Sequence, residues 1–213
     1  MSMSNEEKVI KFYVLCNKLK NTIRKGWLDW NVSRERIESI ADHIYSTQML
    51  AIGMCITYKY DIDLYKVAFM LAFHEIGEIS IGDKNPFEMT KEEKERIEHE
   101  AVHKLLKEYD TEDNFLENTF LEFDAHETKE SKFAFLCDKL ECDLQSKLYG
   151  EEGCVDLSRQ DGNDIMKNPI VKKYLDEGCT WEEMWIKFGQ EVYPYDDNFR
   201  KVSNYALTHK INN

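Results

Sequence analysis

The stretch of sequence that decides the fold lies at residues 72–78 and reads Ala72-Phe73-His74-Glu75-Ile76-Gly77-Glu78. It places an imidazole beside a carboxylate, with a second carboxylate one helical turn further on. Such side chains are the ligands that divalent ions such as Zn²⁺ or Mn²⁺ accept. Adjacent residues on a helix point about 100° apart, so His74 and Glu75 can share an ion only near a helix end. Gly77, Gly82 and Pro86 break the helical pattern soon afterwards.

Two further residues of the same chemistry lie in apolar surroundings. His43 follows Ile40 by one helical turn, and Asp138 stands among phenylalanines and leucines. An ionised carboxylate in such a place needs a positive partner, which a metal, Lys139 or an arginine from elsewhere would supply. A single histidine in an apolar helix is more often an ordinary structural residue. The metal-site hypothesis therefore rests on the whole set rather than on one member.

The rest of the chain indicates an all-α protein. Its 213 residues contain only three prolines and nine glycines, and 42% of them are hydrophobic. Apolar residues recur at three- and four-residue spacing, and no alternating run of strand length stands out. The periodicity predicts helices near residues 5–20, 39–58, 63–78, 90–109, 111–126, 129–149, 161–176, 181–192 and 197–209.

Composition excludes several classes of function. The formal net charge of −13 disfavours a protein that wraps a nucleic acid polymer. The longest uncharged apolar run, residues 49–58, is about half of a membrane-spanning helix, and the N-terminus shows no signal-peptide pattern. The six cysteines form no C-x-x-C pair and read as reduced thiols. We therefore expect a cytoplasmic protein with no membrane association.

Two other metal motifs are less well supported. His-Glu-x-x-His is a zinc-peptidase motif, but Glu78 stands at the fourth position here and removes a ligand. His99 and His103 are one turn apart, within a densely charged segment. This context favours a solvated helix face over a second metal site.

Taken in order, His43, the pair His74–Glu75 and Asp138 resemble the H…HD…D signature of the HD-domain metal-dependent phosphohydrolases. Within that superfamily the chain is most similar to the 5′-deoxynucleotidases. Five ordered strings between about residues 19 and 148 carry the resemblance: Arg24-Lys25-Gly26-Trp27, Glu38-Ser39-Ile40-Ala41-Asp42-His43, residues 72–78 followed by Ile81-Gly82-Asp83, Lys91-Glu92-Glu93-Lys94, and Phe135-Leu136-Cys137-Asp138-Lys139-Leu140.

The resemblance implies a role for each matching residue. His43, His74, the acid at position 75 and Asp138 would hold one divalent ion, with Mn, Co, Zn, Fe and Mg as the candidates. Glu78 would be the catalytic glutamate and Asp83 the loop aspartate beside the leaving oxygen. Arg24 would contact the phosphate of the nucleotide. Trp27 would form part of the wall of the substrate site.

Position 75 departs from the family pattern, because glutamate replaces the expected aspartate. Glutamate is longer by one C–C bond, about 1.5 Å, whereas metal–ligand distances hold to roughly ±0.2 Å. Glu75 must therefore adopt a different rotamer, shift its helix, or leave the ion to three ligands.

The resemblance implies one HD-type helical bundle over residues 1–213, with a core at about 19–148 and additional C-terminal helices at 150–213. It further implies a homodimer, and removal of phosphate from (deoxy)nucleoside 5′-monophosphates through a metal-activated water. Two alternatives stay open. One is a di-iron oxygenase of the HD fold, which needs further ligands such as His99 or His103. The other is a catalytically weakened nucleotide-binding or interaction module.

Overall fold

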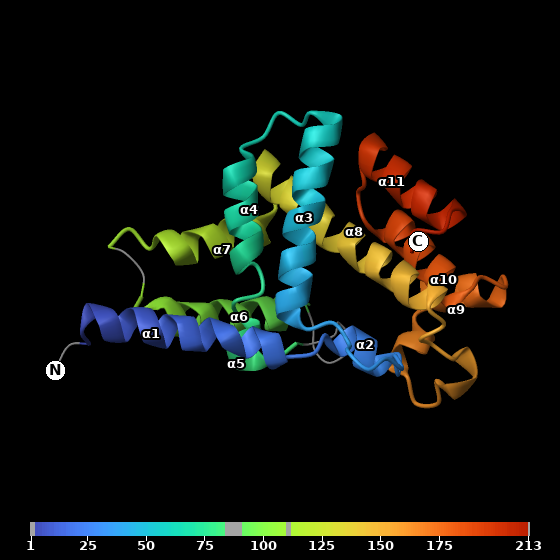
Figure 1. The fold of residues 1–213 in the computed structure, drawn as a ribbon, viewed down its shortest axis with the longest axis horizontal. Helices are drawn as coiled ribbons and strands as arrows, with labels where there is room; N and C mark the ends of the chain where they lie inside the picture. Colours follow the sequence, from blue (N-terminus) through green and yellow to red (C-terminus); the bar gives the residue numbers. More distant parts are fainter. Residues whose placement is uncertain (1–2, 84–90, 110–111, 213) are drawn as a thin grey trace.

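The helix α8, Lys129–Glu151, forms the centre of the molecule. In the computed structural model, which describes residues 3–83, 91–109 and 112–212, it packs against α3, Ile40–Tyr58, and α4, Leu64–Phe73, on one side. It packs against α10, Trp181–Val192, and α11, Asp197–Thr208, on the other. Figure 1 shows α8 running diagonally between these two groups of helices. Because it is covered on several sides, α8 buries apolar and charged residues alike.

Local sequence signals explain where the central helices begin. Ser39 and Thr128 each accept the backbone N–H three residues on, and both complete a reciprocal capping box. Asp63 accepts two backbone N–H groups at the start of α4. Lys59 ends α3 in the left-handed conformation, with φ at 55°. These caps set the entry points of the three helices that surround the core.

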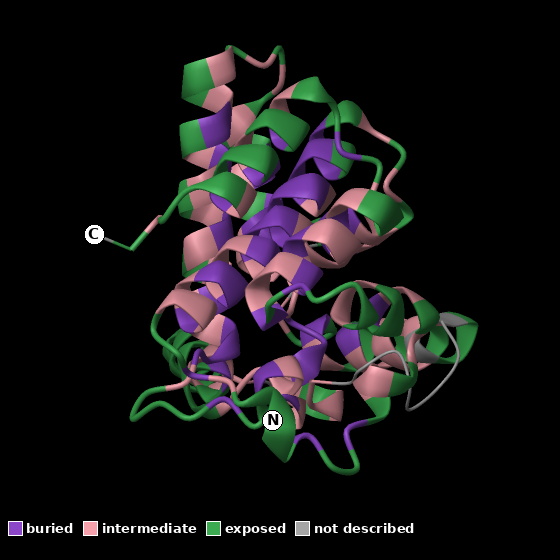
Figure 2. Ribbon diagram, turned by 90° about the vertical axis from the view of Figure 1, so that its right-hand side faces the viewer, coloured by how far each residue is buried: buried purple, intermediate pink, exposed green. Residues whose placement is uncertain are grey.

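The other elements cover this centre. Five further helices precede α8 in the sequence: α1 (Asn5–Cys16), α2 (Lys25–Asp29), α5 (Glu78–Ile81), α6 (Lys91–Leu106) and α7 (Phe115–Ala125). A 3₁₀ turn at Asn17–Asn21 follows α1. After α8 come 3₁₀ turns at Leu157–Arg159 and Asp164–Lys167 and the helix α9, Pro169–Asp176. Figure 2 shows the buried residues gathered between the helices and the exposed ones on their outer turns.

The all-α prediction is confirmed, and each predicted helical range contains a helix. The described residues form no β-sheet, only an isolated bridge between Ile23 and Ser39. The range 63–78 ends early, at Phe73, because the backbone tightens to i→i−3 hydrogen bonds such as Ile76 N–H to Phe73 O at 3.0 Å. The range 161–176 begins as a 3₁₀ turn. The short helix α2 is absent from the prediction, and the predicted loop at 81–89 lies largely outside the described residues.

The segment after residue 150 packs onto the bundle. Its helices α9 and α10 share an apolar cluster with Trp27, Trp30 and Tyr149. A buried polar contact adds to this, since the Tyr195 hydroxyl donates to Asp143 Oδ2 on α8 at 2.9 Å. No helix within the described residues is long and apolar enough to cross a membrane.

The contact of α10 with α8 depends on Gly189, and its replacement by alanine is expected to destabilise the protein. A Cβ at Gly189 would lie 2.1 Å from Asp143 Oδ2. Overpacking of this kind typically costs about 1–3 kcal/mol, which urea unfolding measures. Gly53→Ala on α3 is the control, because its Cβ meets nothing within 4 Å and alanine raises helix propensity by up to about 1 kcal/mol. Equal stability of the Gly189→Ala protein and the wild type would contradict this packing.

Candidate metal centre and substrate cavity

The pair His74–Glu75 lies at a helix end. His74 is the C-cap of α4, and α5 begins only at Glu78. The turn between the two helices lets neighbouring side chains converge, which the 100° step of a continuing helix would oppose. His74 is 4% exposed and Glu78 is 2% exposed, so this turn carries its polar groups into the interior.

His43 and Asp138 complete a four-residue cluster with that pair. His43 Nε2 lies 3.0 Å from Asp138 Oδ1 and 3.3 Å from His74 Nε2. One ligand atom from each of His43, His74, Glu75 and Asp138 falls within 4.8 Å of all the others. Three separate elements, α3, the turn after α4, and α8, therefore meet at one point.

Both imidazoles are oriented by a partner on their far side. His43 Nδ1 lies 2.6 Å from Glu141 Oε2, and His74 Nδ1 lies 2.7 Å from the Leu71 carbonyl oxygen. An imidazole that donates through Nδ1 offers a lone pair at Nε2 once an incoming cation displaces its second proton, so both Nε2 atoms face the centre of the cluster as ligands. Such outer partners are the usual arrangement around a metal-binding histidine.

The electrostatics of the cluster favour an added cation. Burial and the Arg24 charge both oppose protonation of His43, but the Glu141 and Asp138 carboxylates outweigh them and raise its pKa to about 10. Burial alone would keep Asp138 neutral, yet Lys139, 2.8 Å away, and His43 hold the pKa of Asp138 well below its usual range. Two imidazoles and two carboxylates with ionised acids are a donor set that fits a divalent ion.

Glu75 reaches the cluster despite its extra length. Its Oε1 lies 3.6 Å from His43 Nε2 and 3.7 Å from His74 Nε2. The same oxygen accepts Arg24 Nη1 at 2.7 Å. Burial opposes ionisation of this acid, but the Arg24 guanidinium outweighs it and lowers the pKa of Glu75. Of the three outcomes considered for glutamate here, the geometry disfavours an ion left to three ligands, because a Glu75 oxygen lies with the other ligand atoms.

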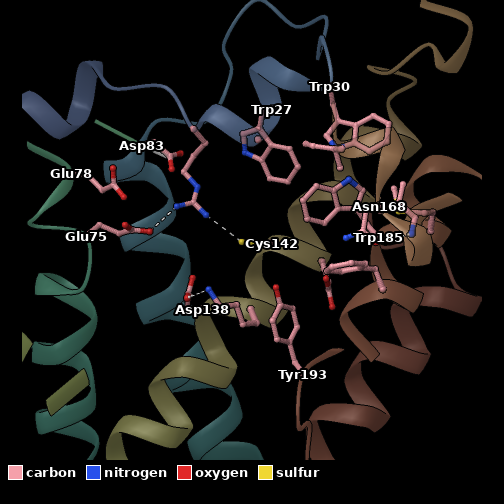
Figure 3. A pocket seen from close by; sticks show the side chains of 18 residues that line it. Trp27, Trp30, Glu75, Glu78, Asp83, Asp138, Cys142, Asn168, Trp185 and Tyr193 are labelled. Atoms are coloured by element: carbon pink, nitrogen blue, oxygen red, sulfur yellow. Dashed lines mark hydrogen bonds and ion pairs between the residues drawn. The ribbon is translucent and has the colours of Figure 1, made fainter. Parts of the chain in front are cut away.

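A cavity of about 370 Å³ opens from this cluster, a volume within the usual range for small-molecule sites. Arg24, Trp27, Glu78 and Asp83 all line it, together with Glu75 and Asp138. Figure 3 shows Glu75, Glu78, Asp83 and Asp138 on one side and Trp30, Trp185 and Asn168 on the other. The structure thus brings every predicted site residue into the cluster or to the wall of one cavity, and His43 and His74 belong to the cluster alone.

Local contacts hold the wall residues in place. The backbone N–H of Lys25, at the start of α2, donates to Asp83 Oδ2 at 2.7 Å. Trp27 Nε1 donates to Glu38 Oε2 at 2.6 Å. The short helix α2 therefore fixes both the aspartate and the indole beside the cavity.

Several residues of the site were not identified from sequence. Glu141 lies one turn beyond Asp138, and this i, i+3 spacing could have indicated it. Asn168, Trp185 and Tyr193 also line the cavity. They lie after residue 150, in a segment without a recognisable sequence motif. Lys139, considered only as a partner for Asp138, also lines the cavity.

The alternative histidines lie elsewhere. His99 Nε2 is 2.6 Å from Asp124, and His103 Nδ1 is 3.0 Å from Glu117. Both pairs join α6 to α7, and the His103 side chain is 60% exposed. This is the solvated surface that the charge pattern predicts, and it supplies no ligands for a second iron beside His43.

Two histidines and two acids that converge at the end of a cavity, inside an all-α bundle, form a candidate metal centre of an enzyme. The family described as "HD domain" matches residues 16–185, most of the chain. The chain belongs to the HD-domain family and, with it, to the metal-dependent phosphohydrolases.

The individual relatives agree. The chain is 31% identical to the 5′-deoxynucleotidase HDDC2 of Dictyostelium discoideum over 67% of its own length and 78% of that protein. It is 28% identical to the 5′-deoxynucleotidase hdd1 of Schizosaccharomyces pombe, over 90% and 99% of the two chains. A Pyrococcus horikoshii protein shares its fold with a TM-score of 0.64 at 20% identity, over 93% and 98% of the chains.

Removal of the carboxylate behind His43 is expected to weaken metal binding. Glu141→Ala frees the imidazole to rotate and lowers its basicity, and loss of such an outer partner typically costs about 10–100-fold in affinity. Calorimetric titration of chelated protein with Mn²⁺ measures the change. Glu141→Gln keeps an acceptor for Nδ1–H and should fall between the two. Wild-type affinity in the alanine variant would refute the role of Glu141.

Proposed function

We propose that this hydrolase removes phosphate from 2′-deoxynucleoside 5′-monophosphates. The observation that carries the proposal is one cavity that joins the His–carboxylate cluster to an aromatic wall. A phosphate at the cluster and a nucleoside along the wall would fill such a cavity. The two curated relatives support this choice of substrate, because both are named as 5′-deoxynucleotidases.

The ion in this proposal is held by His43, His74, Glu75 and Asp138, whose ligand atoms already converge. A divalent cation there supplies positive charge to phosphoryl oxygens and lowers the pKa of a water molecule. Imidazole and carboxylate ligands suit Mn²⁺, Co²⁺, Fe²⁺ or Zn²⁺, and carboxylates also suit Mg²⁺.

Two cationic side chains would bind the phosphate. Arg24 points Nη1 to Glu75 and Nη2 to Cys142 Sγ, 3.3 Å away, and a guanidinium has five N–H donors to share. Lys139 lines the same cavity from α8. Arginine gives a two-pronged contact to a phosphate, which a single ammonium does not.

Glu78 and Asp83 would handle protons. As water adds to phosphorus, Glu78 takes one of its protons, and the bond from phosphorus to the 5′ oxygen breaks. The departing oxygen then gains a proton from Asp83, which Lys25 N–H holds in place, and the proton on Glu78 returns to Asp83 through solvent before the next turnover. The products are a nucleoside and inorganic phosphate, so the atoms balance.

We further propose a homodimer that works in the cytoplasm. The helix α1 buries none of its residues, and Val9, Ile10, Tyr13 and Val14 on one face are 57–67% exposed. A second copy would cover this apolar face. All six cysteines are free thiols, as in a reducing compartment.

Light scattering tests the dimer. It should give twice the mass of one chain, and the mass of a single chain would overturn the dimer.

The function is tested by phosphate release from 5′-, 3′- and deoxynucleoside monophosphates. Chelated protein is resupplied separately with each of the five metals. We expect turnover of 5′-monophosphates alone, with deoxynucleotides preferred. Release from 3′-monophosphates, or none from any nucleotide with metal bound, would contradict the proposal.

Two variants separate metal binding from proton transfer in the same assay. Asp138→Ala should lose bound metal and turnover together, because it removes a ligand. Glu78→Gln should keep its metal and lose about 10²–10⁴-fold in kcat, the usual contribution of a general base. Full activity in metal-free Asp138→Ala protein would contradict the mechanism.

A further inference from the structure

Tyr193 lies at the point where α10 ends. It is the C-cap of the helix and is extended, with φ at −98° and ψ at 144°. Pro194 follows it, and the residue before a proline is disfavoured in the helical region. The chain therefore leaves the helix at Tyr193, whose side chain lines the cavity. Figure 3 shows the ring rising from this bend with its hydroxyl directed into the cavity.

The ring of Tyr193 is held by its neighbours. The Phe135 ring, 6.0 Å away, and the Phe188 ring, 6.4 Å away, meet it nearly edge to face, which is an arrangement that aromatic pairs favour. Lys139 Nζ lies 5.9 Å from the centre of the same ring. These contacts with α8 and α10 fix where the hydroxyl points.

The Tyr193 hydroxyl is unused and within reach of a bound molecule. It makes no hydrogen bond to any residue that the structure describes. Its oxygen is also accessible, because the fully enclosed unpartnered side-chain atoms of the described chain belong to Glu38, Glu78 and three tryptophans. The hydroxyl is therefore open to the cavity that Tyr193 lines.

Tyr193 faces the end of the cavity where the metal ligands lie. Lys139 Nζ contacts Asp138 Oδ2 at 2.8 Å, and the same ammonium lies beside the Tyr193 ring. Burial raises the pKa of Tyr193 to about 12, although the Lys139 charge opposes the shift. The phenol therefore keeps its proton at neutral pH and acts there as a hydrogen-bond donor.

We propose that the Tyr193 hydroxyl donates a hydrogen bond to the phosphate of the substrate. The inference rests on the proposed function and deepens it by assigning a phosphate contact to the segment after residue 150. The terminal oxygens of a phosphate are strong acceptors, and those turned away from the ion need donors. Arg24 and Lys139 already share their N–H groups with carboxylates of the cluster, whereas the phenol has no competing acceptor within the described ranges.

The test measures binding of inorganic phosphate to Mn²⁺-loaded protein by calorimetry. Tyr193→Phe keeps the ring and loses only the hydroxyl, and it should weaken phosphate binding by roughly 10–100-fold, the effect of a hydrogen bond to a charged group. The same contact serves substrate and product, so KM for 2′-deoxyadenosine 5′-monophosphate should rise with little change in kcat. Affinities for Mn²⁺ and for 2′-deoxyadenosine should stay at the wild-type values.

Tyr195→Phe is the matched control. Tyr195 lies two residues further on, but its hydroxyl donates to Asp143 Oδ2 at 2.9 Å, and Tyr195 is not among the residues that line the described cavity. This variant should bind phosphate as tightly as the wild type. Unchanged phosphate affinity in Tyr193→Phe, an equal loss in Tyr195→Phe, or weakened binding of the nucleoside in place of phosphate would overturn the contact.

Phosphate binding keeps the inference separate from the proposed function, because it needs no turnover. If the wild type releases no phosphate from any nucleotide, the proposed function fails. Weaker binding of inorganic phosphate by Tyr193→Phe would then still support the contact. Conversely, turnover of nucleotides with the same KM and the same phosphate affinity in Tyr193→Phe and wild type would reject the contact and leave the phosphatase in place.

Discussion

The site depends on one buried contact, the His43 imidazole held between Glu141 and Asp138. It links α3 to two successive turns of the central helix, at 2.6 and 3.0 Å. Buried charges are tolerated only when they are paired with good geometry. The crossing of α3 and α8 is therefore set by this contact as much as by apolar packing, and everything else in the site is placed relative to it.

The site also requires that α4 ends at Phe73, directly before His74 and Glu75. A helix that continued past Phe73 would turn His74 and Glu75 to different faces. The tightened turn instead sends both side chains toward His43, and Glu78 follows at the start of α5. A close approach supports this turn, since a Cβ at Gly77 would lie 2.7 Å from Glu98 Cγ on α6. Glu75, which stands where the family pattern has aspartate, brings Oε1 to 3.6 Å from His43 Nε2, and the same oxygen meets Arg24.

The sequence predicts the helices, their order and the four converging ligands, because periodicity and ligand chemistry are local signals. It does not predict α2, since five residues are too few to show a helical period, although α2 positions Trp27 and supports Asp83. It also does not predict that Asn168 and Trp185 face the cavity. Their placement depends on how α9 and α10 dock on α8, and that docking is a property of tertiary packing.

The separation of the cavity into two halves has a consequence for how such proteins diverge. The acidic half is built from residues 24–138, whereas much of the aromatic half comes from residues 165–193. Substitutions in the later segment can alter which molecule is accepted without disturbing the ionic cluster. Selectivity and reactivity can therefore drift independently over evolutionary time. A lineage could acquire a new substrate by remodelling two helices while its reaction chemistry stays the same.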